Sequence, residues 1–158
     1  MLKLPQNFVV PQKLETEKFI LRPLTIDDAV NDYEALMTSI DHLQKTKPFG
    51  KNHHWPTKDF HLKQNMIDLA WHQKEFQRQT SFAYTVSNLG DNQCLGCVYF
   101  YPSENINYDV KVILWVRESM LKSNLDQILY QTVKQWLDDQ WPFKSPGFPG
   151  REVPWDKW

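Results

Sequence analysis

The stretch from Asn107 to Leu137 has a pattern that can bind an anion. It begins as an alternating strand, with Val110, Val112, Leu114 and Val116 on one face and Lys111, Ile113, Trp115 and Arg117 on the other. A polar segment, 118–124, follows, and apolar residues then recur every three or four positions, as on one face of a helix. Strand, loop and helix in this order direct helix N-terminal amides at an anion. We therefore expect a phosphate-bearing cofactor here.

Two cysteines, Cys94 and Cys97, form a C-x-x-C pair within a second alternating stretch. On a strand, a spacing of three sends the two thiols to opposite faces. They could then share a metal ion or close a disulfide only if a bulge intervened. Buried cysteines that pack as small apolar residues are the stronger interpretation, and we expect no metal here.

Four histidines, at positions 53, 54, 61 and 72, surround the start of a second predicted helix. No acidic residue or cysteine lies at ligand spacing from them, so the pattern gives little support to a metal site. A solvated loop, or a loop that lines a substrate, is the preferred interpretation.

The helices and strands that position these residues can be predicted from the spacing of apolar residues and from the prolines and capping residues that end or begin each element. A strand is predicted over 18–24, ended by Pro23, and Thr25 caps a helix that has acids in its first turn. A loop is predicted from Ser39 to Pro56, and a second helix from Thr57 to about Gln77. Strands at 81–87 and 94–101 form a hairpin. The strand, loop and helix described above end near Trp141.

Length and composition indicate one folded domain over residues 1–158, with an irregular lead-in at 1–13 and a tail rich in proline and aromatic residues at 142–158. The net charge of −1 provides no attraction for nucleic acid, and no apolar stretch is long enough to span a membrane. The N-terminus lacks a signal-peptide pattern, so a cytoplasmic protein is expected.

The predicted order is β-α-α-β-β-β-α, with a possible last strand near 147–148. Strands that follow one another directly pair antiparallel, while inserted helices cover the sheet. The expected class is therefore α/β (α+β), with a mixed, mostly antiparallel central sheet and helices on both faces.

Two segments resemble the GNAT superfamily of acyl-CoA N-acyltransferases. The segment E-T-E-K-F-I-L-R-P-L-T-I-D-D-A-V-N-D-Y-E-A-L resembles the first strand and helix of the ribosomal-protein-acetylase-like branch. The segment V-I-L-W-V-R-E-S, with the loop and helix after it, resembles the fourth strand and the cofactor helix. The resemblance covers about residues 15–141. It implies transfer of an acetyl group from acetyl-CoA to a primary amine of a small molecule or peptide.

The family's pyrophosphate loop, Gln/Arg-x-x-Gly-x-Gly/Ala, falls on residues 121–126. Asn124 replaces the first glycine and can adopt the left-handed conformation, whereas Asp126 replaces the second glycine or alanine. Its carboxylate would repel a phosphate about 4 Å away by roughly 1 kcal/mol in water and about 4 kcal/mol at a dielectric constant near 20. Lys122 and Arg117 could offset this repulsion. Alternatively, Asp126 is only a helix cap.

The resemblance assigns the acetyl-CoA groove to Trp115, Val116, Arg117, Leu121, Lys122, Ser123, Asn124, Leu125 and Asp126. It assigns the acceptor side to Phe49, His53, His54 and Trp55, although packing in the core explains Trp55 as well. No tyrosine follows Tyr130 to serve as the family's general acid. The family's basic glutamate would fall at Val110, and the adjacent Asp109 points to the other face. No catalytic residue is therefore named.

Aromatic residues in the tail, at positions 143, 148, 155 and 158, are expected to dock across the open edge of the sheet. Docking on a second copy of the chain, in a homodimer, is the alternative. After the cofactor helix there is room for only one of the family's later strands. These departures keep a second hypothesis open, in which a non-catalytic protein of this fold binds another ligand or a protein partner.

Overall fold

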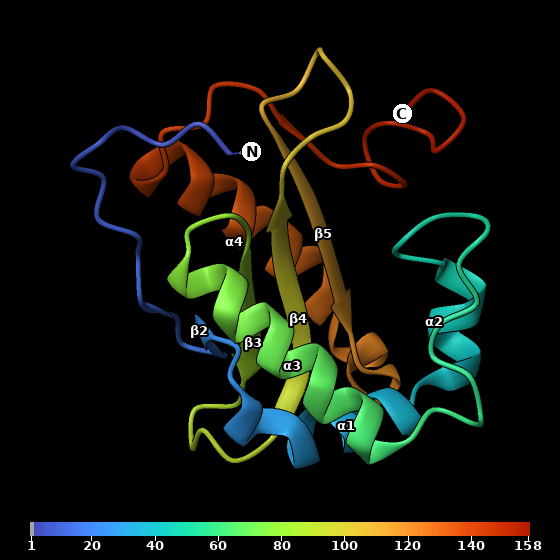
Figure 1. The fold of residues 1–158 in the computed structure, drawn as a ribbon. Helices are drawn as coiled ribbons and strands as arrows, with labels where there is room; N and C mark the ends of the chain where they lie inside the picture. Colours follow the sequence, from blue (N-terminus) through green and yellow to red (C-terminus); the bar gives the residue numbers. More distant parts are fainter. Residues whose placement is uncertain (1) are drawn as a thin grey trace.

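A six-stranded sheet forms the centre of the computed structural model, which describes residues 2–158 (Figure 1). Its strands are β1 (Leu14–Glu15), β2 (Ile20–Pro23), β3 (Phe82–Ser87), β4 (Cys94–Tyr101), β5 (Val110–Val116) and β6 (Pro146–Gly147). They lie side by side in sequence order, and only the pair β5–β6 is parallel. The predicted mixed, mostly antiparallel sheet is confirmed.

Helices cover both faces of this sheet. The helices are α1 (Ala29–Met37), α2 (Ile40–Thr46), α3 (Leu62–Gln77) and α4 (Leu125–Gln140), with 3-10 turns η1 (Ile26–Asp28) and η2 (Glu118–Ser123). In Figure 1, α1 and α3 lie in front of the sheet and α4 lies behind it. No helix within residues 2–158 is both long and apolar enough to cross a membrane.

Two helix predictions are wrong in detail. Residues 40–46 form α2, although the whole of 39–56 was expected to be a loop. This short helix has one fully buried apolar residue, Leu43, so it shows no apolar stripe in the sequence and depends on its contact with the core. The second predicted helix begins at Leu62 instead of Thr57, because a turn closed by the amide of Phe60 on the carbonyl of Thr57 precedes it.

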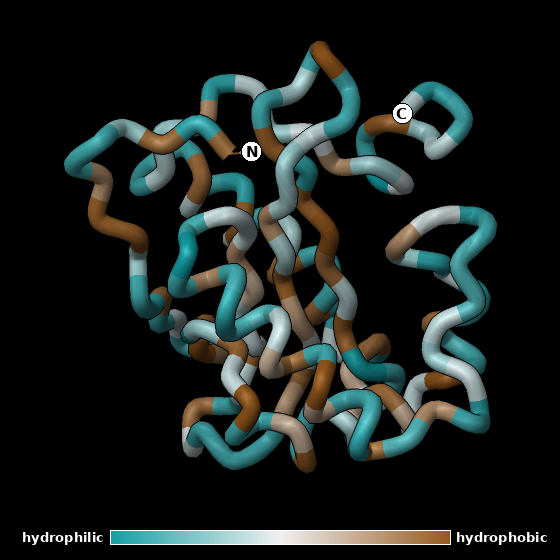
Figure 2. Tube along the Cα trace, in the orientation of Figure 1, coloured by the Kyte–Doolittle hydropathy of each residue, from teal (hydrophilic) through white to brown (hydrophobic). Residues whose placement is uncertain are grey.

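The alternation of β5 divides the core in two, as the sequence indicates. Val110, Val112, Leu114 and Val116 pack toward α4, whereas Ile113 and Trp115 pack toward α1 and α3. Burial of each aliphatic side chain stabilises the fold by roughly 1.5–3 kcal/mol. Figure 2 shows hydrophobic residues gathered along the central strands and mostly hydrophilic residues in the loops around them.

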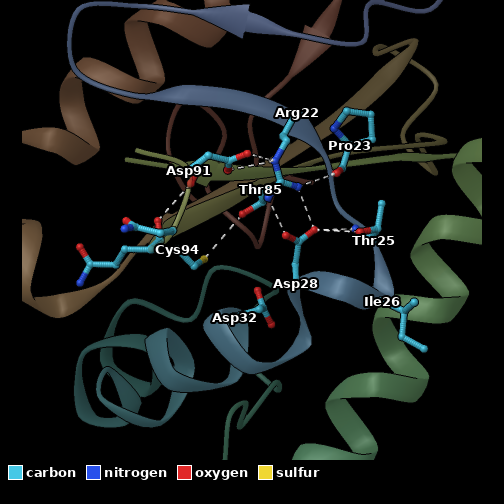
Figure 3. A network of polar contacts seen from close by, with 12 residues as sticks. Arg22, Pro23, Thr25, Ile26, Asp28, Asp32, Thr85, Asp91 and Cys94 are labelled. Carbon is cyan, nitrogen blue, oxygen red and sulfur yellow. Dashed lines mark hydrogen bonds and ion pairs between the residues drawn. The ribbon is translucent and has the colours of Figure 1, made fainter. Parts of the chain in front are cut away.

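The chain enters α1 through a network of charges (Figure 3). The predicted cap at Thr25 is present as a capping box with Asp28, which accepts a hydrogen bond from the Thr25 amide at 2.9 Å. The guanidinium of Arg22 on β2 donates to Asp28 at 2.7 Å and to Asp91 of the β3–β4 turn at 2.9 Å. This network joins the start of α1 to β2 and to the β3–β4 turn, and so helps to hold α1 on the sheet.

A bulge in β4 overturns the expectation for the two cysteines. Ser87 pairs with Cys94 and Val86 pairs with Gly96, so Leu95 is an extra residue in the ladder. Cys94 and Cys97 consequently pack on the same face, in the cluster under α1, while Leu95 packs on the α4 side. Glycine is needed beside the bulge, because a Cβ on Gly96 would lie 2.1 Å from the carbonyl oxygen of Trp115.

The tail docks on the parent domain, as predicted. Pro146 and Gly147 pair with Val110 and Lys111 at the open edge of β5. Phe148 is fully buried in the α4 core, and the Trp158 ring stacks on Tyr108 at 5.0 Å. The tail therefore completes the sheet and one side of the core.

Candidate functional site

Two hollows lie next to Trp115, and together they form the candidate site. The first, called here the β5 groove, has a volume of about 380 Å³. Its lining residues come from α2 and the two residues after it, β5, η2, the first turn of α4 and the tail: His42, Thr46, Lys47, Pro48, Val112, Ile113, Leu114, Trp115, Leu121, Asp126, Pro149, Gly150, Arg151 and Trp155.

The backbone of β5 is open toward this groove. Within residues 2–158, β6 pairs only with Val110 and Lys111, so no strand continues the ladder beside 112–116 on that edge. The carbonyl of Leu114 faces the groove side and accepts a hydrogen bond of 3.4 Å from Arg151. Backbone groups alternate between the two edges of a strand, so Val112 and Val116 present theirs on the same open edge. An extended ligand could pair with this backbone.

At one end of the groove, the N-terminus of α4 carries a left-handed Asn124, with φ of 58°. This left-handed conformation is the one expected for Asn124 as the replacement of the first glycine of the resembled loop. Asp126 in the first turn of α4 is paired with Arg151 of the tail at 2.7 and 2.8 Å. Arg151 therefore neutralises the negative charge of Asp126, a role that the sequence suggested for Lys122 or Arg117. Sequence reasoning missed Arg151, because nothing in the tail indicates where it returns to the domain.

Eight of the nine predicted cofactor residues divide into three groups. Trp115, Leu121 and Asp126 line the groove. Lys122, Ser123 and Asn124 are exposed where η2 meets α4, and the predicted polar loop is the 3-10 turn η2 for most of its length. Val116 and Leu125 are buried in the α4 core.

Arg117 is the clearest correction within that set. Its side chain is buried under α1, where it donates to both carboxylate oxygens of Glu34 at 2.7 and 2.8 Å and to the carbonyl of Cys94 at 3.1 Å. The guanidinium thus anchors α1 to the sheet and does not face the β5 groove. The alternation of β5 predicts that Arg117 lies on this face, but no local pattern indicates that Glu34 is its partner.

The second hollow, called here the Asp32 cavity, lies between α1, α3 and β4 and has a volume of about 250 Å³. It is lined by Asp32, Phe49, His53, Trp55, Asn65, Asp68, Leu69, Trp71, His72, Tyr99 and Tyr101. The Trp55 ring, which lines the cavity, packs edge-on against Trp115, which lines the groove, at a centroid distance of 6.0 Å, so the two hollows meet at this pair of indoles.

Asp32 is a buried carboxylate in the wall of this cavity, with 1% of its surface exposed. One oxygen accepts a hydrogen bond from the Asn65 amide at 2.9 Å, and the other accepts the Cys97 thiol at 3.3 Å. Burial raises the pKa of the Asp32 carboxyl to about 6, and the hydrogen bonds from Asn65 and Cys97 act in the opposite direction. Asp32 is thus mostly ionised at neutral pH and titrates just below it.

The walls of the Asp32 cavity are formed by aromatic side chains that carry no charge at neutral pH. Tyr99 and Tyr101 stack at 5.7 Å, and His72 lies 5.2 Å from Tyr99. Burial lowers the pKa of His72 to about 4 and raises the pKa values of both phenols, so none of these rings is charged at neutral pH.

Three of the four predicted acceptor-side residues, Phe49, His53 and Trp55, line the Asp32 cavity, and His54 is exposed outside it. The residues that sequence reasoning missed are Asp32, Asn65 and the rings of α3 and β4. The stripe of α1 gave one available signal, because Asp32 falls between buried positions of that helix. The bulge also brings ligand atoms of Asp32, Cys94 and Cys97 within 4.8 Å of one another, a spacing that a metal ion could use.

Comparison with solved structures finds chains of the same fold. The ribosomal-protein-S5-alanine acetyltransferase from Vibrio fischeri aligns with a TM-score of 0.60 at 15% identity, over 79% of this chain and 66% of that one. RimL, a ribosomal L7/L12 alpha-N-protein acetyltransferase in complex with coenzyme A, gives 0.57 at 16% identity, over 77% and 64%. The microcin C7 self-immunity acetyltransferase MccE, in complex with acetyl-CoA and AMP, gives 0.57 at 11% identity, over 82% and 68%.

These likenesses show that the chain has the GNAT fold, as the resemblance of its sequence implied. The chain spans about two thirds of the length of these solved chains. No protein-family model matches the sequence, and no curated protein matches it. At these identities the likeness concerns the fold, so the activity must be argued from the two hollows.

Proposed function

We propose that the protein is a cytoplasmic N-acyltransferase that transfers an acetyl group from acetyl-CoA to a primary amine of a small molecule or peptide. The observation that supports this most is the arrangement of the two hollows. An open strand edge beside a helix N-terminus lies on one side of the Trp55–Trp115 pair, and an acidic, aromatic cavity lies on the other.

The groove offers acetyl-CoA the contacts that its parts require. The amide-rich pantetheine arm would pair with the backbone at the open edge of 112–116. The pyrophosphate would lie at the N-terminus of α4, where helix amides attract an anion and Arg151 adds a positive charge. Leu121 and Trp115 would make apolar contacts with the cofactor between these two parts.

In the proposed reaction, the amine nitrogen attacks the thioester carbonyl, the C–N bond forms and the C–S bond breaks, and the departing CoA thiolate takes the second proton of the attacking nitrogen and leaves as the CoA thiol. The ammonium form must first lose a proton to expose its lone pair. Asp32 is the proposed acceptor of that proton, directly or through water, because its pKa of about 6 places it close to neutral pH. Backbone amides of β5 would polarise the carbonyl.

A second candidate is a binding protein without transferase activity. The pair formed by Asp126 and Arg151 favours it, because both residues line the groove and already satisfy one another at the position where a pyrophosphate would bind. Under this hypothesis the Asp32 cavity still takes a ligand, but the groove takes no acetyl-CoA.

Calorimetric titration with acetyl-CoA separates these candidates. The transferase hypothesis expects saturable binding, and release of free CoA thiol when a panel of primary amines is added. Leu121→Arg restores the arginine of the family's loop at a side chain that is 41% exposed, and it should tighten binding by roughly 1 kcal/mol, or about fivefold. Leu89→Arg, at a residue 55% exposed that does not line the groove, is the matched control. No binding at millimolar acetyl-CoA would refute the proposal.

A further inference from the structure

The charged residues of the Asp32 cavity have one sign. Among the described residues that line it, two are carboxylates, Asp32 and Asp68, and none is a lysine or an arginine. Lys111 lies 5.8 Å above the Tyr101 ring, but it does not line the cavity and is paired with Glu104. A ligand that enters this cavity therefore meets negative charge that no side chain of the lining neutralises.

Asp32 lacks a positively charged partner. Within residues 2–158 it forms no ion pair, and its two hydrogen-bond donors, Asn65 and Cys97, are both neutral. A carboxylate has about four acceptor positions, so two remain for a ligand. Buried charges in proteins are normally paired. The partner that this carboxylate lacks is a cation.

The walls favour an organic cation over a hydrated metal ion. Phe49, Trp55, Trp71, Tyr99 and Tyr101 present aromatic rings to the cavity, and the face of such a ring attracts an ammonium group. A volume of about 250 Å³ lies below the range of drug-sized sites, so the ligand is compact. A carboxylate or phosphate on the ligand would be repelled by Asp32 and Asp68.

We propose that the Asp32 cavity selects a compact alkyl- or arylalkylammonium ion without an anionic group, holding its charged nitrogen on Asp32 and its apolar part among the aromatic walls. This deepens the proposed function by naming the class of acceptor. Binding of the amine needs no acetyl-CoA, however, so the inference can be tested by itself.

The test is calorimetry without acetyl-CoA at a pH above 7, with three ligands of nearly the same shape: phenethylamine, 2-phenylethanol and phenylacetate. Methylamine and butylamine extend the series to smaller amines. Phenethylamine should bind at least about tenfold more tightly than the neutral alcohol, and phenylacetate should not bind, because only the ammonium ion gains a charge-assisted hydrogen bond.

Variants separate the site from the rest of the surface. Asp32→Asn and Asp68→Asn should each weaken the binding of the amine, and Trp71→Ala should do so at a residue 46% exposed, where folding tolerates the change. Asp139→Asn removes one exposed carboxylate on α4 and should change nothing.

Equal binding of the amine and the alcohol, or any binding of phenylacetate, would overturn the inference. So would the absence of binding by every amine at millimolar concentration. Displacement of the amine by stoichiometric Zn²⁺, bound to Asp32, Cys94 and Cys97, would also overturn it. Binding of amines without acetyl transfer would leave the inference standing and refute the proposed function. Acetyl transfer to a primary amine that carries an anionic group, with no binding of phenethylamine, would refute the inference and leave the proposed N-acyltransferase activity standing.

Discussion

At the scale of single residues, two groups in the Asp32 cavity should govern how stability depends on pH. The pKa of Asp32 is raised from 3.8 to about 6, so the folded state binds a proton more readily than the unfolded state between these pH values. The contribution of Asp32 to stability therefore falls as pH rises from 4 to 6. The pKa of His72 is lowered from 6.5 to about 4, so its contribution rises with pH over nearly the same range. In the wild type the two effects largely cancel.

Single variants should separate these opposing effects. Relative to the wild type, Asp32→Asn should gain about 2–3 kcal/mol between pH 4 and pH 7, because it removes the cost of burying a charge. His72→Phe should show the opposite trend. Its free energy of unfolding relative to the wild type should be highest near pH 4 and should fall as pH rises to 7, because protonation of His72 destabilises the folded wild type only at low pH. Urea unfolding at a series of pH values measures both differences. Parallel pH profiles for the two variants would contradict the assignment.

Another prediction at this scale concerns the end of the β5 groove. Asp126→Asn frees Arg151 to meet a phosphate and removes a carboxylate that repels it, so acetyl-CoA affinity should rise by roughly 1 kcal/mol, or about fivefold. Arg151→Gln should weaken affinity by a similar factor. Calorimetry measures both, with the remote Asp139→Asn as control. If Asp126→Asn left the affinity unchanged, the electrostatic role of this pair would be refuted.

At the scale of elements, the bulge in β4 turns both thiols toward Asp32, and the Cys97 thiol donates a hydrogen bond to this carboxylate in the cavity wall. Gly96→Ala would place a Cβ 2.1 Å from the carbonyl oxygen of Trp115, whereas a Cβ on Gly90 would meet only the Asn92 side chain, at 3.5 Å. Gly96→Ala should destabilise the fold by about 3 kcal/mol or more. Gly90→Ala should have little effect, and chemical denaturation compares the two. Equal effects would show that the close approach at Gly96 can relax cheaply.

The elements also show what the sequence could and could not provide. Periodicity predicted β5 and α4, and the Thr25 cap predicted the start of the turn η1 that continues into α1, because each of these signals is local. The helix α2 was not predicted from the sequence, because Leu43 is its one fully buried residue and that burial depends on tertiary contacts. The bulge in β4 was not predicted, because Gly96 is the only residue in the sequence of this strand that indicates an extra residue in the ladder. Likewise, Arg117 lay on the predicted face, but its partner Glu34 is 83 residues away.

At the scale of the whole molecule, the tail joins the last strand, the outer side of α4 and the groove into one unit. Phe148 is fully buried and meets Tyr130 of α4 edge-on at 5.3 Å, while Glu152 pairs with Lys134 and Arg151 with Asp126. These contacts place Pro149, Gly150 and Arg151 along the groove. Packing of the tail and the shape of the cofactor site are therefore coupled.

This coupling predicts two effects from one substitution. Phe148→Ala should lower the free energy of unfolding by about 3–5 kcal/mol, because it empties a fully buried aromatic site. Below its melting temperature, the same variant should also bind acetyl-CoA less tightly, since Arg151 loses its anchor three residues away. Trp158→Ala, at the half-buried end of the tail, should cost less stability and leave binding unchanged. Thermal unfolding and calorimetry on the same samples measure both effects. A Phe148→Ala protein with normal affinity would show that the groove keeps its shape without the tail.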